Sequence, residues 1–211
     1  ALVLAKENGR PALFIADLTD ASVTRESVKT LDPTRDAAKL TFKDAPVRRL
    51  GEAGQGFELL EQVFDRAAVL LAFEQCGGAD RCLEMAKAYA LERYAFGRVI
   101  ASYQAIKHKL ADMYVKNELA RSNAYYGAWA LNTGATELPV AASAARIAAS
   151  EAYWFASKEN IQTHGGIGFT WEMDCHLHYR RSRQLSLVAG APRVWKERLG
   201  SHLERRNAAA A

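Results

Sequence analysis

The stretch Phe57-Glu58-Leu59-Leu60-Glu61-Gln62-Val63-Phe64 decides the fold class of this chain. Its apolar residues recur at intervals of three and four, which is the spacing of one face of an α-helix. The pattern continues to about residue 94 without a proline, and the pair Gly77-Gly78 inside it costs only about 1 kcal/mol for each glycine. We therefore expect one long helix over residues 55–94.

The helical pattern is repeated through the rest of the chain. Asn132-Thr133-Gly134 interrupts it, and Pro139 stands where the first turn of a helix tolerates proline. Long helices joined by short loops are typical of an antiparallel bundle. Further helices are expected at residues 102–132, 137–163, 172–184 and 191–204.

The residues before the first helix have a different pattern. Leu2–Ala5, Pro11–Leu18 and Lys39–Phe42 read as strands, and Asn8-Gly9 is a strong hairpin signal. Residues 1–47 are therefore expected to form a β meander, and residues 48–211 the helical bundle. The predicted fold class is mainly α: an antiparallel four-helix-type bundle preceded by a partial antiparallel β domain.

The bulk composition excludes several classes of protein. Of the 211 residues, 49% are apolar and 25% are charged, as in ordinary globular proteins. A net charge of +4, spread along the helices, does not predict a nucleic-acid-binding stripe. No apolar run of membrane-spanning length is present. The three cysteines lack a disulfide pattern and predict reduced thiols in a cytoplasmic protein.

Gln162-Thr163-His164-Gly165-Gly166-Ile167-Gly168-Phe169 is the first candidate for a binding site. Its glycines end a helix and allow backbone N–H groups to approach a ligand closely. Taken alone, the stretch is more often a turn between helices.

Two further candidates lie in and after Glu92-Arg93-Tyr94-Ala95-Phe96-Gly97. A guanidinium at the helix end, at Arg93, suits a bidentate contact with phosphate, although it also suits a helix C-terminus. Gln104 opens the next helix and carries little information by itself.

The other reactive residue types give no catalytic pattern. His176 and His178 are two residues apart, so they point in different directions on a helix, and no metal site is expected. The basic segment Tyr179–Arg183 is usually a solvated face, with a smaller chance of contacting a nucleotide phosphate. Cys76 and Cys82 are expected to be small core residues.

Together these segments resemble the acyl-CoA dehydrogenase family over essentially the whole chain. The family's E-R-x-x-F-G is Glu92–Gly97, its following glutamine is Gln104, and its L-A-D-M is Leu110–Met113. Its Q-x-x-G-G-x-G-F is Gln162–Phe169, and a Y-R-D-A-type segment is Tyr179–Ser182. Asp32–Arg35 matches the family's D-x-T-R element. The four helical motifs, E-R-x-x-F-G, L-A-D-M, Q-x-x-G-G-x-G-F and Y-R-D-A, are each weak alone but specific when they occur in this order.

The resemblance implies a fold and a ligand. Residues 1–47 would be the second half of the family's middle β domain, and residues 48–211 its C-terminal helical domain. The first helical domain and the first half of the β domain are absent from this sequence, so a partner chain or a longer protein would supply them. The implied cofactor is FAD, and the implied substrate is an acyl-CoA thioester.

The resemblance also implies which residues bind these ligands. Residues of the family that reach a neighbouring protomer's flavin match Arg93, Phe96, Gln104, Gln162, Thr163, His164, Gly165 and Gly166. Substrate contacts are implied for Asp65, Arg66 and Gly190.

This chain lacks the family's catalytic carboxylate. Family members abstract the acyl α-proton with a glutamate while a hydride moves to the flavin. The usual base position is Ala189 here, the alternative position on the first helix is Ala67, and a methyl group accepts no proton. The family's flavin-side threonine and glutamine are replaced by Ala191 and Arg193.

The chain lacks the residues of its own catalytic site but keeps those that would contact the flavin of a neighbouring subunit. This asymmetry suggests a non-catalytic subunit of a heteromeric acyl-CoA dehydrogenase. A homologous catalytic subunit, in a dimer or heterotetramer, would supply the base, and an electron-transfer flavoprotein would accept electrons. Such enzymes are similar to those acting on steroid side-chain CoA thioesters in actinobacteria, so fatty acid or steroid degradation is expected.

Two alternatives stay open. A self-sufficient dehydrogenase or oxidase would need a relocated base, for which Glu74, two helical turns beyond Ala67, is a weak candidate. A non-enzymatic assembly module without flavin is the other. The acyl chain, the partner's identity and the electron acceptor are not determined by the sequence.

Overall fold

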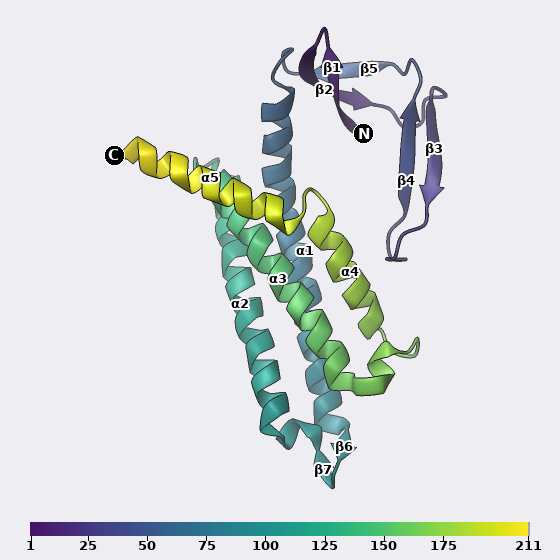
Figure 1. Cartoon of the computed structure of the whole chain (residues 1–211), viewed down its shortest axis with the longest axis vertical. Helices are drawn as coiled ribbons and strands as arrows, with labels where there is room; N and C mark the ends of the chain where they lie inside the picture. Colours follow the sequence, from purple (N-terminus) through teal and green to yellow (C-terminus); the bar gives the residue numbers. More distant parts are fainter. Residues whose placement is uncertain (211) are drawn as a thin grey trace. The chain divides into compact units, whose positions relative to one another are not determined.

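The computed structural model describes residues 1–210 and is mainly helical (Figure 1). Its residues divide into two compact units, 1–64 and 65 onward, and the division falls inside helix α1. The change of domain after residue 47 stays a prediction. The helices are α1 (Gly56–Glu92), α2 (Gln104–Thr133), α3 (Leu138–His164), α4 (Cys175–Leu187) and α5 (Pro192–Ala210).

The first unit contains an antiparallel sheet with strand order β1-β2-β5. Asn8 and Gly9 both have positive φ, 49° and 81°, so the expected hairpin between β1 and β2 is confirmed. Ala12 and Leu13 are buried, and the backbone of Ala12 leaves no room for a Cβ on Gly56. The strands of this sheet are β1 (Leu2–Glu7), β2 (Arg10–Ala16) and β5 (Val47–Leu50).

The expected meander over residues 1–47 is only partly correct. Strands β3 (Val23–Val28) and β4 (Ala37–Phe42) pair with each other in a separate two-stranded ribbon. β5, which was not expected as a strand, pairs with β2 instead of β4. The carboxylates of Asp17 and Asp20 accept hydrogen bonds from the backbone N–H groups of Thr19 and Ser22. These bonds shape the turns where the chain leaves the first sheet.

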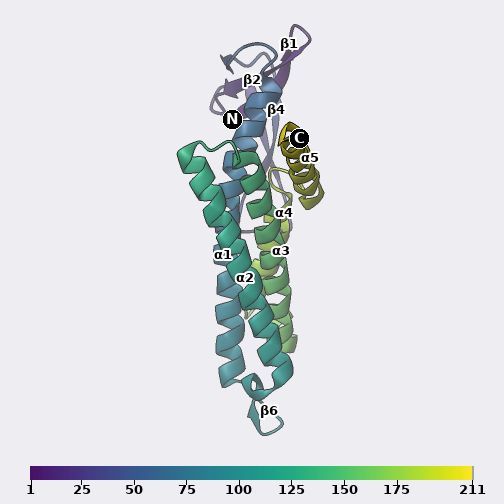
Figure 2. The same cartoon turned by 90° about the vertical axis from the view of Figure 1, so that its left-hand side faces the viewer.

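In the second unit, α1, α2, α3 and α4 run alternately up and down (Figures 1 and 2). Their core contains many alanines, which allow the helix backbones to approach closely. Gly78 has the same role, because a Cβ there would lie 2.4 Å from the Tyr153 ring. The four-helix-type bundle and the mainly-α fold class are thus confirmed. The buried core residues include Ala72, Ala120, Ala124, Ala145, Ala149 and Ala152.

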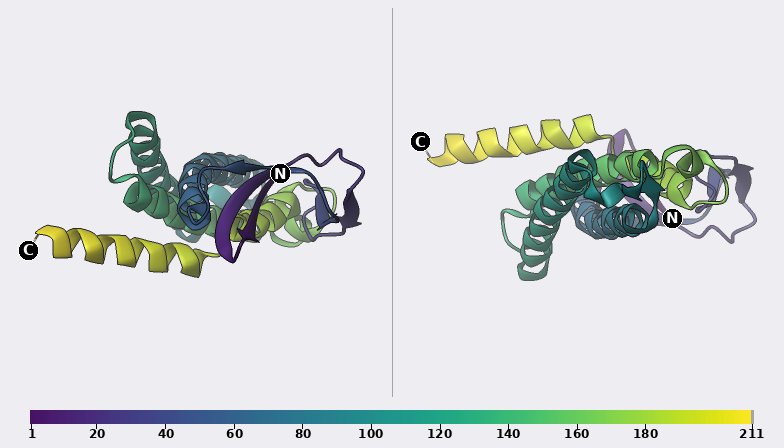
Figure 3. Two further views of the ribbon diagram at one scale, coloured as in Figure 1. Left: turned by 90° about the horizontal axis from the view of Figure 1, so that it is seen from above. Right: turned by 90° about the horizontal axis from the view of Figure 1, so that it is seen from below.

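Helix α5 does not run along the axis of the bundle. It packs on α3, and two views show it crossing the bundle instead of running along it (Figures 1 and 3). It continues to Ala210, six residues beyond the expected end at residue 204.

The two ends of the bundle are named by the elements that meet there. We call the end with α1's C-terminus, the start of α2 and the Gln162–Phe169 stretch the hairpin end. We call the end with Asp65, the loop between α4 and α5, and the start of α5 the α5 end.

Candidate functional site

The hairpin end begins where α1 stops at Glu92. The next residues form a two-residue-turn hairpin of β6 (Tyr94–Ala95) and β7 (Arg98–Val99). Phe96 and Gly97 at its tip have φ values of 53° and 79°, and the Phe96 side chain is 97% exposed. A phenylalanine at positive φ is unfavourable and, at this exposure, gains little from packing within the unit.

The glycine stretch forms the other half of this end. Gly165 has a φ of 66° and donates its N–H to the carbonyls of Ile161 and Gln162, so it caps α3 as expected of a helix-ending glycine. A short 3-10 helix, Gly165–Phe169, follows. A Cβ on Gly168 would lie 2.7 Å from the Ile161 carbonyl oxygen, whereas one on Gly166 would meet nothing within 4 Å.

Two residues of the stretch point inward. Thr163 is buried and donates its hydroxyl to the Glu159 carbonyl at 2.7 Å. His164 is also buried, with Nδ1 2.8 Å from the Asn160 carbonyl oxygen, and its ring stacks on Tyr89 with centroids 4.3 Å apart. The stack joins the ends of α1 and α3, and therefore places Arg93 and the glycine stretch at the same end of the bundle.

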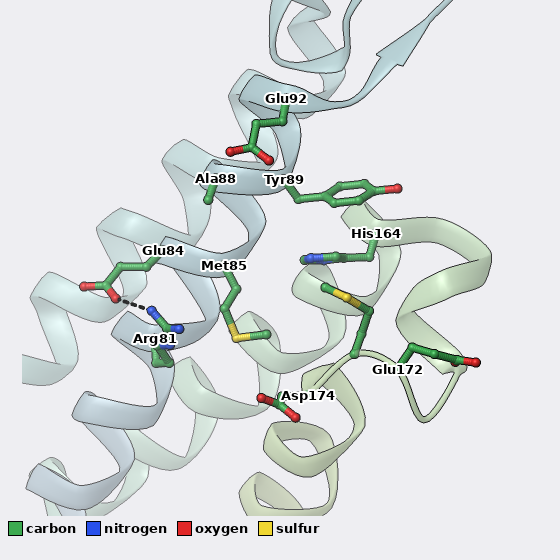
Figure 4. A pocket seen from close by; sticks show the side chains of 10 residues that line it. Arg81, Glu84, Met85, Ala88, Tyr89, Glu92, His164, Glu172 and Asp174 are labelled. Atoms are coloured by element: carbon green, nitrogen blue, oxygen red, sulfur yellow. Dashed lines mark hydrogen bonds and ion pairs between the residues drawn. The ribbon is translucent and has the colours of Figure 1, made fainter.

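A pocket of about 350 Å³ lies beside this stack (Figure 4). Carboxylates dominate its lining, and its one arginine, Arg81, is already paired with Glu84 at 3.2 Å. Such a lining disfavours a phosphate, so the pocket is a poor place for the phosphates of a nucleotide. Its acidic lining residues are Glu84, Glu92, Glu172 and Asp174.

The remaining polar groups of the hairpin end are available to a ligand. Arg93, Gln104 and Gln162 are exposed, and among residues 1–210 their side chains have no hydrogen bond or ion pair. A guanidinium, two amides and an exposed aromatic ring therefore lie at the same end of the bundle as the exposed Gly165 and Gly166. This set suits a ligand that combines phosphates with a flat ring.

The α5 end is different, because its polar groups have partners. Asp65 is 5% exposed and its Oδ1 lies 2.8 Å from a guanidinium nitrogen of Arg198. Arg198 also lies over the Trp195 ring, with its Cζ 4.8 Å from the ring centroid. Arg66 remains exposed, so of the two neighbouring residues expected to contact substrate only Arg66 reaches solvent freely.

The loop between α4 and α5 contains Ala189, the position at which the resemblance places the family's base. Ala189 there has a φ of 57° and Gly190 a φ of 112°, so two successive residues have positive φ. Arg146 of α3 holds this loop, since its guanidinium donates to the carbonyls of Leu185 and Val188.

Arg146 is the residue whose importance sequence reasoning missed. It is 1% exposed and also donates to Gln75 of α1 and to Ser150. Burial lowers the pKa of Arg146 to about 10. The sequence did contain a sign of this role, because Arg146 stands among the alanines of the third helical segment. A charge on an apolar helix face needs partners.

Glu74, the weak candidate for a relocated base, forms an ion pair between two helices. Its carboxylate pairs with Arg181 of α4, whose side chain is 13% exposed. The Arg181 guanidinium occupies a carboxylate oxygen that a base would need for taking up a proton from substrate. Neither Ala67 nor Ala189 offers a proton acceptor.

The cysteines and histidines do not form a second reactive site. Cys76, Cys82 and Cys175 are buried and unbridged, and burial raises the pKa of each thiol. Within residues 1–210, no group of three potential ligands among His, Cys, Asp and Glu is placed to hold a metal ion. In the same part of the chain, every helix is too short or too polar to cross a membrane.

Sequence comparison identifies the family of the helical part of the chain. The profile of the acyl-CoA dehydrogenase C-terminal domain matches residues 54–203. The chain therefore belongs to the acyl-CoA dehydrogenase family. The resemblance expected from the sequence is thus confirmed.

Individual relatives and solved structures are similar to this chain over most of its length. The chain is 38% identical to "Acyl-CoA dehydrogenase IpdE2" of Mycobacterium tuberculosis over 212 aligned positions, which cover 96% of this chain and 62% of the relative. The solved butyryl-CoA dehydrogenase of Megasphaera elsdenii matches with a TM-score of 0.90 and 27% identity, over 96% of this chain and 55% of that one. A variant of the Tcur3481-Tcur3483 steroid acyl-CoA dehydrogenase matches with a TM-score of 0.88 and 30% identity, over 98% of this chain and 55% of that one.

Proposed function

We propose that this chain is a subunit of an FAD-dependent acyl-CoA dehydrogenase that completes the flavin site of a homologous catalytic subunit. The observation that carries the proposal is the contrast between unpaired polar groups at the hairpin end and two alanines where the family has its base. The chain spans 62% of the length of IpdE2 of Mycobacterium tuberculosis and 55% of that of the Megasphaera elsdenii enzyme.

The residues of the hairpin end fit the flavin nucleotide. Arg93 would neutralise part of the pyrophosphate, and the amides of Gln104 and Gln162 would orient polar groups next to it. Gly165 and Gly166 leave backbone exposed for close approach, while Thr163 and His164 support the stretch from inside. Phe96 would cover a flat part of the ligand and so exclude water. When bound, FAD supplies the acceptor for the hydride.

The α5 end supports a non-catalytic role for the chain's own site. A self-sufficient enzyme would need a free carboxylate near Ala189 or Ala67, and both Asp65 and Glu74 are engaged by arginines. The catalytic glutamate would therefore belong to the partner subunit. The substrate is proposed to be an acyl-CoA thioester, with a steroid or fatty acyl group, and the electron acceptor an electron-transfer flavoprotein.

Co-expression with a homologous dehydrogenase chain from its own genomic neighbourhood tests this proposal. The purified complex should be yellow and oxidise an acyl-CoA, whereas this chain alone should hold little FAD and show no turnover. Arg93→Ala should lower bound FAD about tenfold, as expected for the loss of one charge-assisted contact. Arg205→Ala, an exposed arginine on α5, should leave the flavin content unchanged.

Two results would contradict the proposal. Turnover by the chain alone would favour a relocated base, and Glu74→Gln would then abolish it. A stable complex that never contains flavin would favour a non-enzymatic assembly role.

A further inference from the structure

A second pocket of the bundle is not used by the proposed function. It has a volume of about 420 Å³ and lies between the last part of α1 and the start of α2, which run side by side (Figure 2). Its α1 residues differ from those that line the acidic pocket beside His164, so the two pockets use different faces of that helix. We call it the leucine–lysine pocket, and its lining includes Leu83, Lys87, Leu91, Lys107, Leu110 and Tyr114.

The spacing of residues on two antiparallel helices builds this pocket. Leu83, Lys87 and Leu91 are four residues apart, so they form one row along α1. Leu110 and Tyr114 have the same spacing on α2 and line the pocket from the other side. Leu83 and Leu110 also pack against the buried core of the bundle, which fixes the floor of the pocket. Leu91 and Tyr114 are 55% and 56% exposed, so apolar surface remains open to a ligand.

Two lysines are the charged residues of the lining. Lys87 belongs to α1 and Lys107 to α2, and no carboxylate lines the pocket with them. Within the described part of the chain neither lysine makes an ion pair, whereas Lys109, also on α2, pairs with Glu159 at 2.7 Å. Two ammonium groups at one apolar pocket repel each other, and an anion bound between them would relieve that repulsion. The pocket therefore combines apolar surface with an unmet demand for negative charge.

The leucine–lysine pocket is remote from the positions at which the resemblance places the chemistry of the family. Leu83 is sixteen residues beyond Ala67 on α1, which corresponds to about 24 Å of helix rise. Ala189 lies in the loop between α4 and α5, at the α5 end of the bundle. The pocket is therefore separate from both positions implied for a catalytic base and from the acyl group that would be oxidised beside them.

We propose that the leucine–lysine pocket binds a free medium-chain alkyl carboxylate. The alkyl chain would cover the leucines, and the carboxylate would lie between the ammonium groups of Lys87 and Lys107. A mainly apolar lining with a few polar groups, and a volume in the range of roughly 300–1,000 Å³, is typical of small-molecule sites. A neutral apolar ligand would leave both charges unpaired, and an inorganic anion would leave the leucines uncovered. The ligand is neither a thioester nor a nucleotide, and the inference does not rest on the proposed function.

Isothermal titration calorimetry with decanoate, on the chain in the assembly in which it is purified, tests this inference. We expect saturable binding that is at least about tenfold tighter than that of decan-1-ol, which has the chain without the charge. Butyrate has the charge without most of the chain, and should bind about a hundredfold more weakly or worse. Decanoyl-CoA should displace decanoate at least about tenfold less effectively than unlabelled decanoate does, because its thioester offers no carboxylate to the lysines. Binding of decanoate should weaken as the salt concentration rises.

Variants assign the binding to this pocket. Lys87→Gln and Lys107→Gln should each raise the Kd for decanoate about fivefold or more, and the double variant should raise it further. Leu91→Gln should raise the Kd about tenfold, because it removes apolar contact with the chain. The matched controls are Lys116→Gln and Leu119→Gln, since both residues are exposed on α2 and neither lines the pocket. These two variants should leave the Kd unchanged.

Four outcomes would overturn the inference. They are the absence of saturable binding of decanoate in the assembly, equal affinity for decanoate and decan-1-ol, equal displacement by decanoyl-CoA, and equal effects of the pocket variants and their controls. Thermal unfolding of each variant shows whether it remains folded, and the substituted residues are exposed, so a second pocket variant provides the test if one does not fold. Flavin content and turnover, which test the proposed function, enter none of these outcomes.

Discussion

The hairpin end and the α5 end of the bundle contain similar residue types but use them in opposite ways. At the hairpin end, Arg93 and two glutamines point to solvent without partners among the described residues. At the α5 end, Arg198 and Arg146 are engaged by Asp65 and by backbone carbonyls. Polar groups that satisfy one another stabilise a fold, whereas exposed unpaired groups are free to bind.

Under the proposed function, this difference would account for a chain that keeps one half of an active site and lacks the other. If alanine stands where the catalytic carboxylate would be, the surrounding polar residues would be useful only by stabilising the fold. The buried Asp65–Arg198 pair and the Arg146 contacts have that character. Residues that contact a ligand held by another subunit need to remain exposed, as Arg93 does.

The largest expected effect concerns Arg146. Arg146→Met removes the donors to Gln75 and to two backbone carbonyls in a buried site, and should lower the free energy of unfolding by about 3 kcal/mol. Arg93→Met at the hairpin end should change it by less than about 0.5 kcal/mol. Urea unfolding followed by circular dichroism measures both. Equal effects of the two variants would show that the ends do not differ as we describe.

A smaller effect is expected for the Asp65–Arg198 pair. Asp65→Ala leaves a guanidinium with limited solvent access unpaired and should cost about 2 kcal/mol, partly offset by the residual exposure of Arg198. In a double-mutant cycle, Asp65→Ala should cost clearly less in the background of Arg198→Met. Strict additivity of the two single effects would mean that the pair does not stabilise the α5 end.

The helix ends were predictable from sequence to within about three residues, except for the end of α5, because apolar spacing and helix-ending glycines are local signals. Gly165 caps α3 for the reason that its sequence context indicated. The long-range ion pairs between helices were not predictable in this way. Asp65 and Arg198 are 133 residues apart, and Glu74 and Arg181 are 107 apart, so no local pattern relates them. The expected ligand contacts at both ends remain predictions.

The smallest expected effects concern the glycine stretch at the hairpin end, which contains two glycines with different surroundings. They test whether residues that stabilise the fold differ from residues that are free to bind a ligand. Gly168→Ala places a methyl group 2.7 Å from the Ile161 carbonyl oxygen and 3.0 Å from the His164 Cβ, and should destabilise the unit by about 1 kcal/mol or more. Gly166→Ala meets no atom within 4 Å and should change stability by less than about 0.5 kcal/mol.

The two variants distinguish a glycine that stabilises the fold of the stretch from a glycine that contacts a ligand. If Gly166 provides close backbone approach, Gly166→Ala should lower the FAD content of the complex with the catalytic subunit while its unfolding midpoint stays unchanged. Gly168→Ala should lower the midpoint first and the flavin content as a consequence. Full flavin content in Gly166→Ala would mean that the exposed backbone of the hairpin end does not contact the cofactor, and Arg93 and the glutamines would then account for binding there.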